Sequence, residues 1–264
     1  MNFLEQKSRK IREDILDIFE KGKRGHVPSA YSLVEILVTL YYQKSKILPE
    51  NINQSDRILL SKGHGCMALY AILCDLGFFS KSEFEKFCTV DGILGGHPTK
   101  SKVPGVELSS GSLGHGFSIG VGKATSLKLK KSKNKVYIIL GDGECNEGTN
   151  WEAALSANKN KLNNLTILID YNKQQSYGST QEVCPLEPFH SKWEAFGLET
   201  FEVDMINTPE MLLGILNKEQ TAPRAIICHT IKGQGNSILE TDRSWHHKSK
   251  VTPEEVAKLR EALK

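Results

Sequence analysis

Apolar residues recur along this chain with two different periods, which predict alternating helices and strands. At the N-terminus Leu4, Ile11, Ile15, Ile18 and Phe19 follow helical spacing, so residues 3–20 are predicted to form an amphipathic helix. Further helices are predicted over residues 31–42, 66–76, 149–159, 209–216 and 253–263, and strands over residues 136–140, 165–169, 201–204 and 224–230; residues 56–60 form a short apolar run that leads into SKGHG. Ser29 or Ser32 is the expected cap of the second helix.

Two of the predicted strands are continuous apolar runs, VYIIL at 136–140 and LTILI at 165–169. Such runs are typical of strands that helices cover on both faces. The order strand, turn, helix, strand between them predicts a parallel crossover. The whole pattern predicts an α/β fold with a doubly wound, mostly parallel sheet flanked by helices. A length of 264 residues allows one large domain over residues 1–264.

Glycine interrupts this pattern between residues 91 and 122, in GILGGHP, VPG and SSGSLGHGFSIGVG. We expect the backbone to approach a ligand closely here, because glycine permits such contact. A floppy loop is the alternative, but Leu113, Phe117, Ile119 and Val121 are expected to anchor the segment.

Composition narrows the function classes. A formal net charge of +3 favours neither a nucleic-acid nor a membrane partner, and no apolar run is long enough to span a membrane. The charged N-terminus lacks the apolar core of a signal peptide. Six cysteines without CxxC or metal-site spacing are typical of free thiols, so a cytoplasmic location is expected. No GxGxxG follows a strand, which argues against a dinucleotide-binding oxidoreductase.

Two polar residues follow the buried strands. Asp142 lies in GDG after the first strand, and Asn172 lies in DYN after the second. In neighbouring parallel strands these side chains would meet at the carboxyl edge of the sheet, where α/β proteins bind ligands. A carboxylate, an amide oxygen and a backbone carbonyl suit Mg²⁺ that also binds phosphate oxygens. The helix beginning near Thr149 is expected to direct its N–H groups at that anion.

At these residues the chain resembles the thiamine-diphosphate motif and, more closely, transketolase. The resemblance runs from Gly25 to about Lys248 through GHVPS, SKGHG, GGHP, GSLGHG, GDGECNEG, DYNKQQ, TIKGQG and SWHHK. It implies metal ligation by the side chains of Asp142 and Asn172 and by the backbone of Gln174. The implied cofactor-binding residues are Ser29, Lys62, His64, Gly111, Leu113, Gly143, Glu147, Asn172 and Lys232. Glu147 and Glu152 match acidic residues of a dimer interface near the cofactor.

The same resemblance implies a catalytic group of histidines at His26, His64, His97 and His246, around the thiazolium ring and the sugar. Neutral imidazole can accept a sugar hydroxyl proton near neutral pH, a role that suits His26 or His246. His246 and His247 are adjacent and could exchange roles. His115 could contact the site, whereas His190 and His229 are expected to be structural.

The implied function is transfer of a two-carbon ketol unit from a ketose, or its phosphate, to an aldose, with thiamine diphosphate and Mg²⁺ (or Ca²⁺ or Mn²⁺). The family also needs a pyrimidine-binding domain with a glutamate, for which this chain is too short. A partner subunit carrying that domain, in a heterotetramer, is expected; an artificial truncation is the alternative. The competing functions are other thiamine-diphosphate reactions (1-deoxyxylulose-phosphate synthesis or 2-oxo acid decarboxylation) and the role of a non-catalytic regulatory subunit.

Overall fold

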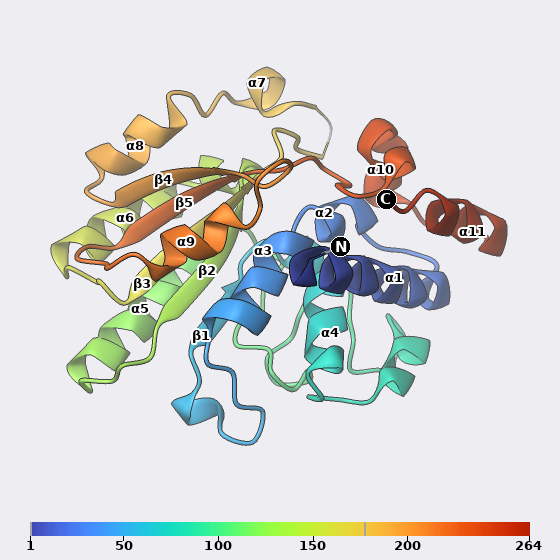
Figure 1. The fold of residues 1–264 in the computed structure, drawn as a ribbon, viewed down its shortest axis with the longest axis horizontal. Helices are drawn as coiled ribbons and strands as arrows, with labels where there is room; N and C mark the ends of the chain where they lie inside the picture. The colour runs from blue at the N-terminus through green and yellow to red at the C-terminus, as the bar shows by residue number, and fades with distance from the viewer. Residues whose placement is uncertain (1, 177) are drawn as a thin grey trace.

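Five parallel strands form the sheet, in the order β1-β2-β3-β5-β4 (Figure 1). In this computed structural model, which describes residues 2–176 and 178–264, the strands are β1 (Arg57–Leu60), β2 (Val136–Gly141), β3 (Leu165–Tyr171), β4 (Glu199–Asp204) and β5 (Arg224–His229). All neighbouring pairs are parallel. The four predicted strands and the parallel crossover from β2 to β3 are therefore confirmed, and the apolar run at residues 56–60 supplies a fifth strand, β1. Gly141 pairs with Asp170, so the carboxyl ends of β2 and β3 lie side by side.

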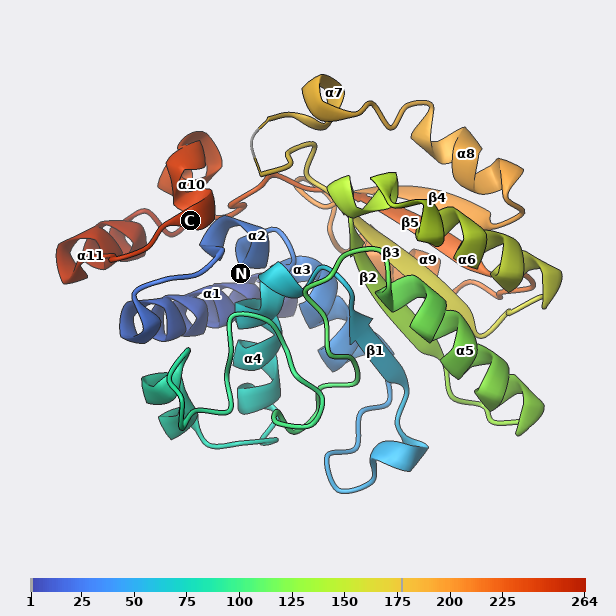
Figure 2. The ribbon, with the colours of Figure 1, turned by 180° about the vertical axis from the view of Figure 1, so that it is seen from behind.

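Helices cover both faces of this sheet, and the core is divided accordingly. Alternate residues of β2, such as Tyr137 and Ile139, belong to a core that includes α1 (Phe3–Gly22), α3 (Val34–Val38) and α4 (Cys66–Asp75). The intervening Ile138 and Leu140 belong to a second core, which α5 (Gly116–Leu129), α6 (Gly148–Lys159) and α8 (Phe189–Ala195) share (Figure 2). Burial on both faces explains why the strands are uniformly apolar. The predicted α/β class is confirmed.

Further helices and helical turns complete the fold. They are α2 (Val27–Tyr31), a π-helical turn (Thr39–Lys44), α7 (Thr180–Val183), α9 (Met211–Asn217), α10 (Ser237–Thr241), α11 (Pro253–Glu261) and 3₁₀ turns at Ile52–Gln54, Gly63–Gly65, Lys81–Lys86, Gly143–Asn146 and Arg243–His247. None of the described helices is both long and apolar enough to cross a membrane.

The predicted helix over residues 31–42 is wrong in its continuity. The structure divides this region into α2, α3 and the π-helical turn. Neither serine caps α3, because Ser29 lies within α2 and Ser32 directly follows it. The Ser32 hydroxyl instead donates a hydrogen bond to Asp170 at 2.6 Å, so a tertiary contact replaces the expected local one.

The glycine-rich stretch is also more structured than its composition suggested. Residues 91–115 form neither helix nor strand, but α5 begins at Gly116 and was not predicted. Phe117 and Val121 anchor α5 in the core, as expected. Ile119 does not, because its side chain is 43% exposed.

Candidate active site

A cavity of about 580 Å³ lies at the carboxyl edge of the sheet. Its walls include Lys62 after β1, Asp142 after β2, Asn172 after β3 and Lys232 after β5. All the site residues predicted from the sequence line it except His97: His26, Ser29, Lys62, His64, Gly111, Leu113, Asp142, Gly143, Glu147, Asn172, Gln174, Lys232 and His246. One cavity therefore collects residues from across the chain.

Asp142 and Asn172 are held by the backbone at the ends of two adjacent strands. Asp142 Oδ1 accepts a hydrogen bond from the Gly143 amide at 2.7 Å, and Oδ2 accepts one from the Lys173 amide at 2.6 Å. Asn172 Oδ1 accepts from the Gln174 amide at 3.0 Å. These bonds fix both oxygen-bearing side chains, while each oxygen keeps a lone pair for a further ligand.

Two charged residues that line the cavity, Asp142 and Lys232, are incompletely balanced by other charges of the chain. Burial, followed by the neighbouring Asp170 charge, raises the pKa of Asp142 to about 7. Burial, followed by the Lys62 charge, lowers the pKa of Lys232 to about 8. Among the described residues Lys232 forms no ion pair; its ammonium donates to the Gln175 carbonyl at 3.2 Å. A buried carboxylate with oxygen neighbours and a buried ammonium fit a divalent cation together with an anion.

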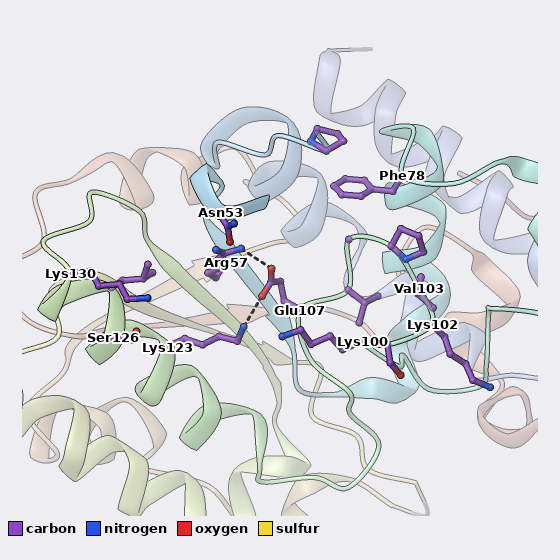
Figure 3. Close-up of a pocket in the computed structure, with 16 residues that line it drawn as sticks. Asn53, Arg57, Phe78, Lys100, Lys102, Val103, Glu107, Lys123, Ser126 and Lys130 are labelled. Atoms are coloured by element: carbon purple, nitrogen blue, oxygen red, sulfur yellow. Dashed lines mark hydrogen bonds and ion pairs between the residues drawn. The ribbon is translucent and has the colours of Figure 1, made fainter. Parts of the chain in front are cut away.

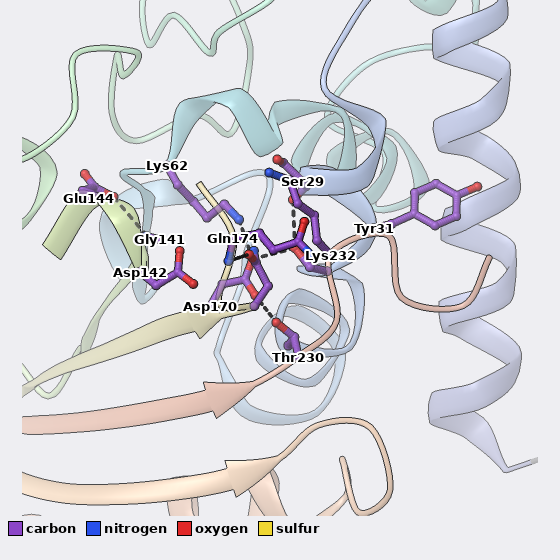
Figure 4. Close-up of polar contacts among 12 residues, drawn as sticks. Ser29, Tyr31, Lys62, Gly141, Asp142, Glu144, Asp170, Gln174, Thr230 and Lys232 are labelled. Carbon is purple, nitrogen blue, oxygen red and sulfur yellow. Dashed lines mark hydrogen bonds and ion pairs between the residues drawn. The ribbon is translucent and has the colours of Figure 1, made fainter. Parts of the chain in front are cut away.

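Asp170, which the sequence analysis missed, is the centre of the polar wall. Its fully buried carboxylate forms an ion pair with Lys62 and accepts hydrogen bonds from Ser32 and Thr230 (Figure 4). The Asn172 amide also donates to it, at 3.4 Å. An aspartate at the end of a continuous apolar run, LTILID, was the available signal. Asp170 aligns the cavity wall by holding side chains from four segments.

Glu144 is a second residue that the sequence analysis missed. Its buried carboxylate accepts hydrogen bonds from the Ser61 hydroxyl and from the amides of Gly114 (3.0 Å) and Gly141 (3.2 Å). Burial raises the pKa of Glu144. This one side chain joins the end of β1, the glycine-rich loop and the end of β2.

The backbone of Gly111 packs closely against the imidazole of His97. The backbone of Gly111 has φ of +140°, and a Cβ there would lie 3.2 Å from Cγ of His97. A larger residue would therefore be strained and would press on the imidazole. His97 stands behind Gly111, outside the lining of the cavity, with its ring centre 6.3 Å from that of His26.

The imidazoles of His26, His64, His97, His246 and His247 form a group that we call the histidine cluster. The ring centre of His26 lies 5.8 Å from His64, 5.3 Å from His246 and 5.0 Å from His247. His26 Nδ1 donates to the His246 carbonyl at 2.8 Å, which assigns its proton to Nδ1 and leaves the lone pair on Nε2. Burial is the main cause that lowers the pKa of His26, His64 and His97 and, to about 3, of His246.

Other expectations have different outcomes. The N-cap residue of α6, Glu147, lines the cavity, whereas the helical residues Gly148–Lys159 do not. The 3₁₀ turn Gly143–Asn146 separates the end of β2 from the start of α6. His190 and His229 both contact Glu202 of the edge strand β4 and do not line the cavity. His115 and Glu152 are exposed and do not line it either.

A second hollow, of about 620 Å³, lies beside β1, away from the carboxyl edge (Figure 3). Its central carboxylate, Glu107, accepts from Arg57 at 2.9 Å and from Lys123 at 2.6 Å. Figure 3 shows Glu107 between these two cations. The polar groups at its centre satisfy one another, in contrast to those of the first cavity.

Comparison with known proteins agrees with this geometry. Residues 5–264 match the family described as "Transketolase, thiamine diphosphate binding domain". The chain is 38% identical to a subunit of the apulose-4-phosphate transketolase of Phocaeicola vulgatus, over 92% of this chain and 88% of the relative. It is also 38% identical to 6-deoxy-6-sulfo-D-fructose transketolase subunit SqwG of a Clostridium species, over 95% and 92% of the two chains.

Among solved structures, transketolase from Leishmania mexicana superposes with a TM-score of 0.89 at 26% identity. That match covers 98% of this chain but 41% of the solved one, so this chain spans about two-fifths of that transketolase. Fold, sequence and family match lead to one conclusion: the chain belongs to the transketolase family of transferases, as its thiamine diphosphate binding domain.

Proposed function

We propose that this chain binds thiamine diphosphate and Mg²⁺ in the 580 Å³ cavity and, with a partner subunit, transfers a two-carbon ketol unit between sugars. The observation that carries the proposal is the meeting of Asp142 and Asn172 at the carboxyl ends of adjacent parallel strands. The buried ammonium of Lys232 on the same cavity supports it, since a diphosphate would supply the missing negative charge.

In this proposal Asp142 Oδ, Asn172 Oδ1 and the Gln174 carbonyl hold Mg²⁺, for which Ca²⁺ or Mn²⁺ could substitute. The remaining contacts to the cofactor come from Ser29, Lys62, His64, Gly111, Leu113, Gly143, Glu147 and Lys232. When bound, thiamine diphosphate supplies the electron sink that lets a carbon–carbon bond beside a carbonyl break. The chain itself provides position, charge balance and proton transfer.

Proton transfer is assigned to the histidine cluster, with His26, His64 and His246 as its proposed catalytic members and His97 as a positioning residue. The lowered pKa of His26 keeps its imidazole neutral near pH 7, and the bond from Nδ1 to the His246 carbonyl leaves Nε2 as the base. A neutral Nε2 can take the proton of a sugar hydroxyl as the adjacent bond breaks. His97 would act by positioning His26, since it lies outside the lining.

A partner subunit is the remaining part of the proposal. This chain would be one thiamine-diphosphate-binding domain over residues 1–264, and the partner would carry the pyrimidine-binding domain with its glutamate in a heterotetramer. The naming of both relatives as single subunits of their transketolases, and the two-fifths coverage of a solved transketolase, support this division. Both relatives are named for acidic sugars, which supports a sugar phosphate or a similar acidic sugar as substrate. Six free cysteines support the cytoplasm as the compartment.

Replacing the central metal ligand tests this function. Asp142→Ala should weaken Mg²⁺-dependent binding of thiamine diphosphate by at least about 100-fold. Loss of a residue that only hydrogen-bonds to a metal ligand can already cost about that much, and loss of the ligand itself should cost no less. Calorimetry with and without Mg²⁺ measures it. Asp204→Ala is the matched control, since Asp204 is an exposed aspartate at the end of β4 and should leave binding unchanged. Wild-type binding by Asp142→Ala would refute the metal assignment.

Activity needs its own test. The chain mixed with its partner should turn over pentulose or hexulose phosphates in the presence of an aldose acceptor, with product formation followed by a coupled assay. Turnover of 2-oxo acids alone would refute the ketol-transfer proposal, and tight cofactor binding without any turnover would favour a regulatory role.

A further inference from the structure

Three members of the histidine cluster bring their ring nitrogens close together. One ring nitrogen from each of His26, His246 and His247 lies within 4.8 Å of the others. The rings of His246 and His247, which are adjacent in the chain, have centres 4.2 Å apart, and both approach His26 within 5.3 Å. Around a tetrahedral ion with metal–nitrogen bonds of about 2.0–2.1 Å, such nitrogens would be about 3.3 Å apart. Small rotations of these side chains would close the remaining gap.

The hydrogen bonds of these rings have the form found in metal sites. A histidine that binds a metal usually donates its other N–H to a carbonyl or carboxylate, which fixes the ring and its tautomer. His26 does this, because its Nδ1 donates to the His246 carbonyl at 2.8 Å. In addition, His246 Nδ1 is buried and has no hydrogen-bond partner among the described residues. One ring is therefore already oriented, and a second carries a buried nitrogen without a partner.

We propose that His26, His246 and His247 form a site for a divalent transition ion such as Zn²⁺, separate from the magnesium site at Asp142 and Asn172. Three imidazoles favour Zn²⁺, Co²⁺, Ni²⁺ or Cu²⁺ over Mg²⁺, which prefers oxygen ligands. The exposed His247, the last residue of the 3₁₀ turn Arg243–His247, completes the site. Three protein ligands leave a fourth position for water or a sugar hydroxyl.

Occupation of this site would inhibit the enzyme. The ion would take the Nε2 lone pair of His26, and that consequence rests on the proposed function, in which this nitrogen is the base. The ion would also stand at the sugar end of the cavity, because His26, His246 and His247 all line it. Inhibition should therefore compete with the ketose and leave thiamine diphosphate bound.

Cobalt is the probe for the binding step, because its visible absorption distinguishes four-coordinate nitrogen sites from six-coordinate oxygen sites. Co²⁺ is titrated into the full chain in excess Mg²⁺, without thiamine diphosphate. We expect one equivalent to bind with the intense band of a four-coordinate site. His247→Ala should weaken this binding at least about tenfold, since removing a ligand costs no less than removing an outer partner. His115→Ala, which removes an exposed histidine outside the cavity, should bind as wild type does.

The alternative outcomes separate this inference from the proposed function. A band that survives in His247→Ala, or a weak oxygen-type band that disappears in Asp142→Ala, would overturn the histidine site. Cobalt binding that depends on His247 supports the site even if the assembled complex shows no ketol transfer. In an active complex, His247→Ala should raise the inhibitory Zn²⁺ concentration at least about tenfold. Equal inhibition of both proteins would refute the inhibitory role.

Discussion

The two ends of the cavity differ in the ionisable groups that they bury. We call the wall made by Lys62, Asp142, Asp170 and Asn172 the carboxylate end. There, buried groups of opposite charge lie together, since Asp170 forms an ion pair with Lys62 and also accepts hydrogen bonds from Ser32 and Thr230. In the histidine cluster, burial lowers the pKa of His26, His64, His97 and His246 and keeps these rings neutral.

The two ends also differ in how they are held. The carboxylate end is attached to the ends of β1, β2 and β3, and backbone amides or buried side chains hold its oxygen atoms. The histidine cluster comes from four separate segments, and its described ring contacts include the 2.8 Å bond from His26 Nδ1 to the His246 carbonyl and a longer one of 3.3 Å between His246 Nε2 and the Ser176 hydroxyl. We conclude that the carboxylate end is suited to holding a charged group of a ligand in one position. The histidine cluster is suited to moving protons.

Replacing His26, the proposed base, is the strongest test of separate roles for the two ends. His26→Ala should lower kcat of the complex by about 10²–10⁴-fold, the usual contribution of a general base. Thiamine diphosphate binding should stay as in the wild type, because the carboxylate end is intact. Steady-state kinetics and calorimetry on the same protein separate the two effects, with His115→Ala as the matched histidine control. If cofactor binding fell together with kcat, the two ends would not be independent.

Removing the centre of the carboxylate end should affect stability instead. Asp170→Ala leaves the buried Lys62 without its counter-ion, which typically costs about 3–5 kcal/mol in free energy of unfolding. The shift of the urea midpoint at unchanged slope measures this loss. Asp91→Ala, in an exposed loop, should change stability by no more than about 0.5 kcal/mol. A loss below about 1 kcal/mol for Asp170→Ala, well short of the usual cost of an unpaired buried charge, would show that another group balances Lys62.

The sheet and much of the carboxylate end could be predicted from the sequence, for a physical reason. Unbroken apolar runs identify buried strands, and residues directly after parallel strands must share one edge. That is why the sequence alone places Asp142 and Asn172 together. Asp170 and Glu144 lie in the same segments, but their importance depends on the approach of other side chains, which tertiary packing sets: Ser32, Ser61, Lys62 and Thr230.

The histidine cluster and the helix breaks were less predictable. No local pattern indicates that the neighbourhoods of residues 26, 64, 97 and 246 meet, so the resemblance to a family was needed to bring them together. The break between α2 and α3 lies at Ser32, whose hydroxyl donates to Asp170, a tertiary contact that a local capping rule could not show. The start of α5 was hidden because its first turn contains glycine and is stabilised by burial of Phe117.

Lys232, which lines the same cavity, gives the smallest effect and the sharpest test of the idea that this cavity binds an anion. Displacement of its pKa from 10.5 to about 8 corresponds to a cost of roughly 3 kcal/mol at pH 7 for burying the charge. Lys232→Met should therefore stabilise the chain without cofactor by up to that amount while weakening thiamine diphosphate binding.

The pH dependence of this gain has a definite sign. Between pH 8 and 10.5 the unfolded lysine binds more protons than the folded one, so the free energy of unfolding of the wild type rises with pH relative to Lys232→Met. The advantage of Lys232→Met should be complete below pH 8 and should disappear towards pH 10.5, as urea denaturation of both proteins across this range would show. Lys159→Met is a matched control, because Lys159 is exposed at the end of α6 and its replacement should give no such pH-dependent difference. If Lys232→Met instead destabilised the chain at pH 7, the lysine charge would already be balanced within the protein, and the cavity would need no bound anion to balance it.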